Sequence, residues 1–221
     1  MAKRYPRPLY LLSACLLTAC AGSQEEPQSS VTYSYRCDGS DQSIVVNLSG
    51  ERGFLFSREA SQWMTLDADS GAFIGDDVYF RPDQPPDLAP GQTAQIRVLG
   101  RQLEGCSNDP RAAIWEAAKL SGVSYRAVGQ EPPWILEIHR EQGFLLSTGY
   151  EGEQHRFPYT EPQSDPDQRR SRYVSEAAGE AIVITIFGEP CRDSMSGEAF
   201  DSRVEIEWDR QMLRGCGRPL H

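Results

Sequence analysis

Short segments in which every second residue is apolar recur along this chain from Tyr33 onward, with turn residues between them. Because side chains of a β-strand alternate between its two faces, this period of two predicts strands that bury one face. The short connections indicate antiparallel pairing and an all-β fold. The same pattern places Phe54 and Phe56 together on the apolar face of a strand. The other clear examples are residues 44–48, 78–80, 96–98, 134–138, 182–186 and 204–208.

One segment between these strands has the signature of a helix. Asn108 or Asp109 fits its N-cap, Pro110 its first position and Gly122 the residue after its end. Its apolar face is too weak to organise a large core, so the helix is interpreted as a connector packed on one of the domains. That face consists of Ile114, Ala117, Ala118 and Ser121.

The chain therefore divides into two small domains. The sequence predicts two antiparallel β-barrel or sandwich domains, residues 33–107 and 124–221, joined by a short helix within residues 108–123. Residues 158–167 are rich in proline and polar residues and are expected to form a surface loop in the second domain. Each domain is near the size at which a single core is only marginally stable.

Residues 1–19 have the composition of an export signal. Three basic residues precede an apolar stretch, residues 8–19, that is too short to span a bilayer. The stretch leads into Leu-Thr-Ala-Cys at residues 17–20, which resembles the lipobox of bacterial lipoproteins. The resemblance implies cleavage before Cys20, diacylglycerol and palmitate on that cysteine, and a flexible tether over residues 20–32. It places the protein in the bacterial cell envelope, at the outer membrane facing the periplasm.

Three alternatives to this interpretation stay open. Residues 12–15 repeat the lipobox pattern after a shorter apolar run, which would make Cys15 the anchor. The segment is also compatible with a secretory signal that contains two incidental cysteines. Retention at the inner membrane is the third alternative.

The cysteines support export independently. Once Cys15 leaves with the signal and Cys20 carries lipid, four of the six cysteines remain. An even number in an oxidising compartment indicates two disulfides, for which three connectivities exist. The division into two domains selects the pairs Cys37–Cys106 and Cys191–Cys216.

Charge and motif content exclude several functions. Without residues 1–19 the chain has 19 Lys and Arg against 32 Asp and Glu, a net charge of −13. This charge argues against nucleic acid or anionic lipid as a ligand, so contact with a membrane is expected through the N-terminal lipid only. The three histidines lack metal-ligand spacing, and no nucleophile elbow or phosphate-binding loop occurs. The sequence therefore predicts no enzyme, no metal and no cofactor. The three histidines are His139, His155 and His221.

Four motifs of the first domain carry a family resemblance. They are residues 35–39 (Tyr-Arg-Cys-Asp-Gly), 69–72 (Asp-Ser-Gly-Ala), 79–82 (Tyr-Phe-Arg-Pro) and 105–106 (Gly-Cys). In this order they resemble the membrane-bound inhibitors of c-type lysozyme, small β-barrel proteins of the bacterial envelope. The resemblance implies c-type lysozyme as the protein partner and a loop inserted into its active cleft. It assigns the contact to Ser70, Gly71 and Arg81, with the Ser70 hydroxyl and the Arg81 cation facing the carboxylates of the enzyme.

The chain departs from the family pattern beside these motifs. Phe73 and Ile74 stand where the family usually has Arg-Tyr, and Arg81-Pro82 replaces Lys-Gly. Arginine keeps the charge of lysine but has a different shape and hydrogen-bonding geometry. The alternative is a structural or binding lipoprotein with the same fold that inhibits nothing, in which Ser70 belongs to an ordinary turn.

The second domain is similar to a family of bacterial envelope domains without an assigned activity. Its motifs are residues 126–134 (Arg-Ala-Val-Gly-Gln-Glu-Pro-Pro-Trp), 191–196 (Cys-Arg-Asp-Ser-Met-Ser) and 215–217 (Gly-Cys-Gly). The resemblance supports the pairing of Cys191 with Cys216 and implies no function. A hydrolase built on a pair of carboxylates in this domain is the remaining alternative.

Overall fold

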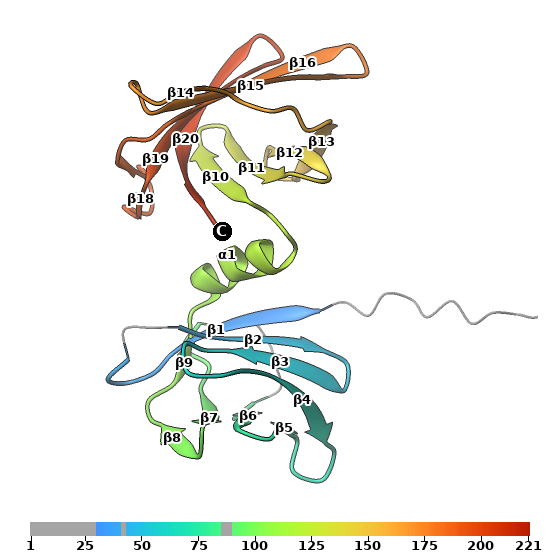
Figure 1. Ribbon diagram of the computed structural model, residues 1–221, viewed down its shortest axis with the longest axis vertical. Helices are drawn as coiled ribbons and strands as arrows, with labels where there is room; N and C mark the ends of the chain where they lie inside the picture. Colours follow the sequence, from blue (N-terminus) through green and yellow to red (C-terminus); the bar gives the residue numbers. More distant parts are fainter. Residues whose placement is uncertain (1–29, 41–42, 85–89) are drawn as a thin grey trace, which may run out of the picture.

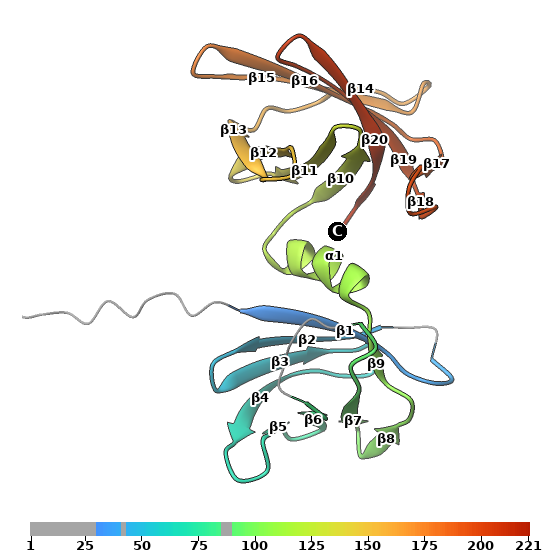
Figure 2. The ribbon, with the colours of Figure 1, turned by 180° about the vertical axis from the view of Figure 1, so that it is seen from behind.

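Two antiparallel sheets make up almost the whole molecule (Figures 1 and 2). The computed structural model describes residues 30–40, 43–84 and 90–221. Each sheet has nine strands and curls around a core of its own, and a single helix of the described chain, α1, lies between them. The predicted all-β fold class is confirmed. None of the described residues belongs to a helix that is long and apolar enough to cross a membrane.

The first sheet has the strand order β8-β7-β6-β5-β4-β3-β2-β1-β9. The amide of Asn108 donates to the carbonyl oxygen of Gln92 at 2.8 Å, and that of Ala94 donates to Cys106 at 3.3 Å. These bonds join the start of β7 to β9, so the sheet closes on itself. The strands are β1 (Val31–Arg36), β2 (Ser43–Ser49), β3 (Arg52–Phe56), β4 (Ser61–Asp67), β5 (Ala72–Ile74), β6 (Val78–Pro82), β7 (Ala94–Val98), β8 (Arg101–Leu103) and β9 (Ser107–Asn108).

Alternate residues of these strands point inward and form the first core. The predicted inward faces of residues 44–48, 78–80 and 96–98 are confirmed. Two tyrosines of β1 that the apolar pattern did not single out are fully buried with them. The core contains Tyr33, Tyr35, Ile44, Val46, Leu48, Leu55, Met64, Phe73, Val78, Phe80, Ile96 and Val98.

Strand β3 faces the opposite way from the one that its aromatic residues indicate. Leu55 is fully buried in the core, whereas Phe54 and Phe56 share the outer face and are only half-buried. Gly53 accounts for this register, because a Cβ atom at that position would lie 2.8 Å from Leu48 Cδ2 inside the core. A shift by one residue would exchange the two faces of the strand, so the crowded glycine position fixes the pairing.

Helix α1 (Pro110–Leu120) begins and ends as predicted. Asp109, rather than Asn108, is its N-cap, and one carboxylate oxygen accepts from the amides of Arg111 and Ala112, both at 3.1 Å. The predicted apolar face is right at Ala118 but wrong at Ile114. Ala113 and Ala118 are the buried residues, and Ile114 is 52% exposed. Because α1 packs mainly on β1, small residues are buried at this contact.

The opposite side of α1 contacts the second sheet through Trp115. The guanidinium groups of Arg126 and Arg218 lie 5.0 and 4.4 Å from the centre of the indole ring. The ring of Phe200 lies 5.4 Å from it. Cation–π contacts that are partly shielded from water stabilise by about 1–2 kcal/mol each. The helix therefore connects the two sheets physically as well as in sequence.

The second sheet has the order β13-β12-β11-β10-β20-β19-β16-β15-β14. Strand β14 lies within residues 158–167, so the expectation of a loop throughout that segment is wrong at its centre. A separate hairpin, β17–β18, lies beside this sheet. The strands are β10 (Tyr125–Gln130), β11 (Pro133–His139), β12 (Gly143–Thr148), β13 (Glu153–Phe157), β14 (Gln163–Asp165), β15 (Arg170–Ala177), β16 (Glu180–Phe187), β17 (Cys191–Arg192), β18 (Ala199–Phe200), β19 (Ser202–Trp208) and β20 (Gln211–Pro219).

Alternation also builds the second core. The predicted faces of residues 134–138, 182–186 and 204–208 point inward, with Ile186 and Trp208 at the edge of the core. The fully buried members are Ala127, Trp134, Leu136, Ile138, Phe144, Leu146, Ile182, Ile184, Val204, Ile206 and Leu213.

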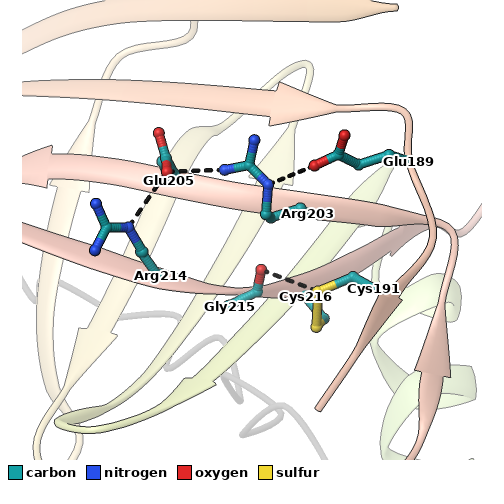
Figure 3. Close-up of polar contacts among 7 residues, drawn as sticks. All are labelled: Glu189, Cys191, Arg203, Glu205, Arg214, Gly215 and Cys216. Atoms are coloured by element: carbon teal, nitrogen blue, oxygen red, sulfur yellow. Dashed lines mark hydrogen bonds and ion pairs between the residues drawn. A yellow bond between two sulfur atoms is a disulfide. The ribbon is translucent and has the colours of Figure 1, made fainter. Parts of the chain in front are cut away.

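Both predicted disulfides are confirmed, each within one sheet system: Cys37 with Cys106, and Cys191 with Cys216. The first joins the end of β1 to the start of β9, its partner strand. The second joins the β17–β18 hairpin to β20, where Cys191 Sγ lies 3.6 Å from the carbonyl oxygen of Gly215 (Figure 3).

A ladder of ion pairs crosses the strands next to the second disulfide (Figure 3). Arg203 of β19 pairs with Glu189 at 2.6 Å and with Glu205 at 2.8 Å. Glu205 also pairs with Arg214 of β20 at 3.3 Å. Single surface pairs contribute little to stability, but a chain of four groups ties the segment after β16 to β19 and β20. We interpret this ladder as structural.

Candidate functional site

The predicted contact residues Ser70 and Gly71 lie in the exposed turn between β4 and β5. Asp67 braces this turn, because one of its carboxylate oxygens accepts from the amides of Asp69 at 2.9 Å and Ser70 at 3.3 Å. The carbonyl oxygen of Asp67 accepts from the amide of Gly71 at 2.8 Å. Gly71 has a φ of +68°, a conformation that glycine adopts readily. The backbone thus holds the turn in one shape with its tip in solvent.

The hydroxyl of Ser70 is available to a partner. Its oxygen accepts a long hydrogen bond, 3.4 Å, from the amide of Ala72. A hydroxyl has one proton to donate in addition to its acceptor capacity. No group among residues 30–40, 43–84 and 90–221 accepts that proton, so Ser70 can donate it to an external acceptor.

Arg81 is an exposed cation on β6. Its neighbours Val78 and Phe80 face the core, so Arg81 points outward. Within the described part of the chain it has no ion-pair or hydrogen-bond partner. Arg97 on the adjacent strand differs, because its guanidinium lies 4.1 Å from the centre of the Tyr79 ring. Arg81 therefore offers a planar set of five N–H donors to a partner.

The sheet register brings the turn and Arg81 to one place. Strands β5 and β6 pair with Phe73 opposite Phe80 and Ile74 opposite Tyr79. Continued by one residue, this register places Ala72, the residue after the turn, opposite Arg81. All three predicted contact residues thus lie at the same end of the β5–β6 pair. Figure 1 shows the β4–β5 turn at the end of the first sheet farthest from α1.

The departures from the family pattern have different structural weights. Phe73 is buried in the core, with its ring 6.3 Å from that of Phe80, so it serves the fold. Ile74 is exposed beside the site. Asp83, just after Arg81-Pro82, is tied to Thr93 by a side-chain hydrogen bond of 2.5 Å and by a backbone bond of 3.1 Å. The predicted lipid attachment residue, Cys20, lies outside the described residues.

The sequence-based interpretation missed Asp67, the residue that gives the turn its shape. Its signal is present in the sequence, because an aspartate two or three residues before a Ser-Gly pair is typical of turns in which the side chain caps backbone amides. The absence of a partner for Arg81 had no such signal. It depends on which strands lie next to β6.

The motifs of the second domain form packing contacts. A Cβ atom on Gly129 would lie 2.1 Å from the indole nitrogen of Trp134. One on Gly215 would lie 2.1 Å from the carbonyl oxygen of Val128. These two glycines leave room for the Trp134 ring against the neighbouring strands β10 and β20. The resemblance in this domain thus falls on residues that determine the fold.

Asp193 of the same motifs secures the β17–β18 hairpin to β10. One carboxylate oxygen accepts from the amide of Ser196 at 2.6 Å and from its hydroxyl at 2.7 Å, and the other accepts from Gln130 at 3.0 Å. Desolvation tends to raise the pKa of Asp193. The hydrogen bonds from Ser196, Gln130 and Met195 outweigh it and hold the pKa below its ordinary value.

Asp193 is therefore expected to stabilise the second domain only while it is ionised. A lowered folded-state pKa contributes stability above the unfolded pKa of about 3.9, and this contribution disappears as pH falls through the folded value. Asp193→Asn should lose about 1–3 kcal/mol of unfolding free energy at pH 7. The difference in unfolding free energy between Asp193→Asn and wild type should become smaller below pH 4. Urea unfolding at pH 7, 5 and 3 measures both, with exposed Asp167→Asn as control. A gap independent of pH would contradict the assignment.

A concavity of the second domain is lined by tyrosines. Tyr125, Tyr159 and Tyr173 face it together with Arg140 and Glu161. Desolvation raises the pKa of the Tyr159 phenol, and the charge of Glu161 adds to this effect. Desolvation also raises the pKa of the Tyr173 phenol, and the neighbouring phenol of Tyr159 adds to it. Phenol hydroxyls are protonated at neutral pH even at their ordinary pKa of about 10, so both can act as hydrogen-bond donors. The Tyr159 hydroxyl donates to Glu161 at 3.3 Å.

The described residues contain no group of three or more histidine, cysteine, aspartate or glutamate side chains arranged to hold a metal ion. No family model, no curated protein and no solved structure matches the chain. The functional interpretation therefore depends on the geometry of the site and on the motifs that contain it.

Proposed function

We propose that this protein inhibits c-type lysozyme by inserting the β4–β5 turn and Arg81 of its first domain into the active cleft of the enzyme. One observation carries the proposal: a free hydroxyl donor, Ser70, and a guanidinium without a partner among the described residues, Arg81, lie at the same exposed end of strands β5 and β6. The motifs that hold both residues resemble the inhibitors of this enzyme class.

The chemistry of the two side chains complements that of the enzyme. A c-type lysozyme works with two carboxyl groups in its cleft, in environments that differ in polarity. Arg81 donates two parallel hydrogen bonds to one carboxylate, and Ser70 donates one to the other. Hydrogen bonds in which one or both groups are charged are shorter and roughly twice as strong as neutral ones, the more so where water is excluded.

The braced turn lowers the cost of this binding. A loop that must be ordered on association loses conformational entropy, which subtracts from affinity. Asp67 already holds the turn through three hydrogen bonds, so the Ser70 hydroxyl is presented in advance. The acidic remainder of the chain attracts a basic enzyme from a distance and raises the association rate.

We further propose that lipid on Cys20 anchors the protein to the outer membrane, facing the periplasm. The two disulfides fit this oxidising compartment. An inhibitor fixed there meets the enzyme where it reaches the cell wall. The second domain, on the far side of α1, has no proposed activity.

The direct test is the lytic activity of c-type lysozyme in the presence of residues 21–221. We expect inhibition at equimolar concentrations, and weaker binding when a chito-oligosaccharide occupies the active cleft. Calorimetry with and without the oligosaccharide measures this competition. Full lytic activity in excess of the protein would contradict the proposal and favour a structural or binding lipoprotein that inhibits nothing.

A further inference from the structure

A second exposed feature of the first domain lies away from the proposed lysozyme site. It is a groove on the outer face of β1 to β4, beside the C-terminal half of α1, and we call it the aromatic groove. Among the described residues no charged one lines it, although 24% of the chain is charged. Its lining residues are Ser30, Thr32, Asn47, Phe54, Phe56, Trp63, Ala117, Leu120 and Ser121.

The sheet register creates the floor of the aromatic groove. Asn47 of β2 pairs with Phe54 of β3, which pairs with Trp63 of β4. The ring of Phe54 lies 4.3 Å from that of Phe56 and 4.9 Å from that of Trp63, edge to face. Trp63 is 59% exposed and Leu120 is 41% exposed. Contiguous apolar surface of this kind marks an interaction site more often than a plain surface.

A cation borders the groove. The guanidinium of Arg52 lies 4.5 Å from the centre of the Trp63 ring, and Arg52 has no ion pair with any described residue. A guanidinium stacked in this way keeps its N–H donors free for phosphate oxygens. Tryptophan is enriched at membrane–water interfaces, where its ring is accommodated at the level of the headgroups. The combination of tryptophan, leucine and arginine therefore fits a phospholipid surface.

The chain itself leads from the groove towards the membrane. Ser30 lines the groove, and Cys20 stands ten residues earlier. Ten residues span at most about 36 Å when fully extended. A lipid on Cys20 would keep the groove within that distance of the bilayer. Such a tether gives even a weak second contact a high effective concentration.

We infer that the aromatic groove docks on the phospholipid surface that holds the lipid of Cys20. Trp63 and Leu120 enter the interface, and Arg52 contacts lipid phosphates. The net negative charge of the rest of the chain disfavours approach to anionic lipids by other faces. The inference depends on anchoring at Cys20, which belongs to the proposed function, and it adds a defined orientation on the membrane.

In the test, a chemical bond at Cys20 attaches the protein to the membrane. In a protein of residues 20–221 the other four cysteines form disulfides, so Cys20 is the free thiol. It is coupled to maleimide lipid in vesicles of phosphatidylethanolamine and phosphatidylglycerol, with or without brominated acyl chains. We expect brominated chains to quench the Trp63 fluorescence at least twofold. The Trp63 signal is the difference between wild type and Trp63→Phe.

Three other tryptophans provide the background signal. Trp134 is buried, Trp208 packs against the second core and Trp115 lies between two guanidinium groups. The matched control is Trp63→Phe combined with Tyr150→Trp. Tyr150 is 96% exposed in the turn after β12 of the second sheet. We expect this introduced tryptophan to remain unquenched.

Several results would overturn the inference. Equal quenching at positions 63 and 150, or none at either, would show that the groove does not face the bilayer. Dimers in sedimentation that dissociate in Trp63→Phe would assign the groove to a second copy. Residues 21–29 can be replaced by a glycine–serine linker in the lipid-free protein. If this changed the emission of Trp63, the aromatic groove would be assigned to the tether. Because the coupling is chemical, mass spectrometry of the cell-derived protein tests natural lipidation on Cys20 separately.

Discussion

Replacing Arg81 by alanine is expected to weaken inhibition of c-type lysozyme by well over tenfold. The substitution leaves a carboxylate of the enzyme buried against a neutral surface. Removing one partner of a buried, hydrogen-bonded charge pair costs about 2–5 kcal/mol, and 1.4 kcal/mol is a factor of ten in affinity. Because Arg81 has no partner among the described residues, its removal should leave the stability of the first domain nearly unchanged. Inhibition constants from lysis assays measure the effect.

Arg97→Ala is the matched control for Arg81→Ala. It removes the same charge from the neighbouring strand, but Arg97 stacks on Tyr79 rather than extending at the turn. Its inhibition constant should change little. Ser70→Ala should fall between the two, since one hydrogen bond to a charged group contributes about 1.5–3 kcal/mol. Equal constants for wild type and Arg81→Ala would remove the cleft-insertion mechanism.

Loss of the Cys37–Cys106 disulfide is expected to destabilise the first domain by about 4 kcal/mol. The two cysteines are 69 residues apart, and in the chain-entropy model a loop of that length stabilises by this amount. The bond holds β9 next to β1, and the Asp109 cap that starts α1 follows directly. The double variant Cys37→Ser/Cys106→Ser should therefore lose hydrogen-exchange protection first along β1 and β9. Exchange followed by mass spectrometry locates the loss.

The second disulfide supplies the control for this prediction. Cys191 and Cys216 are 25 residues apart, which corresponds to about 3.5 kcal/mol in the same model. The variant Cys191→Ser/Cys216→Ser should increase exchange in β19 and β20 while β1 stays protected. If either variant raised exchange equally in both sheets, the two sheets would unfold as one cooperative unit.

The sequence by itself determined the fold class, the helix with its start to within one residue, the cysteine pairs and most inward-facing residues. Apart from the cysteine pairs, these features depend on neighbours along the chain. Alternation decides which side of a strand is apolar, and Asp109 caps a helix through amides two and three residues later. The cysteine pairs followed because each pair lies within one predicted domain. Such local patterns do not depend on how distant segments of the chain pack.

Tertiary structure decided the features that depend on contacts between distant segments. Phe54 and Phe56 lie outside because Gly53 faces the crowded interior, a constraint set by Leu48 on the next strand. Small residues of α1 are buried because the helix packs on β1. The β4–β5 turn and Arg81 meet because of the β5–β6 register, and the aromatic groove exists because four strands and a helix align their outer faces. Residue spacing cannot encode these juxtapositions, because many pairings satisfy one apolar pattern and only packing selects among them.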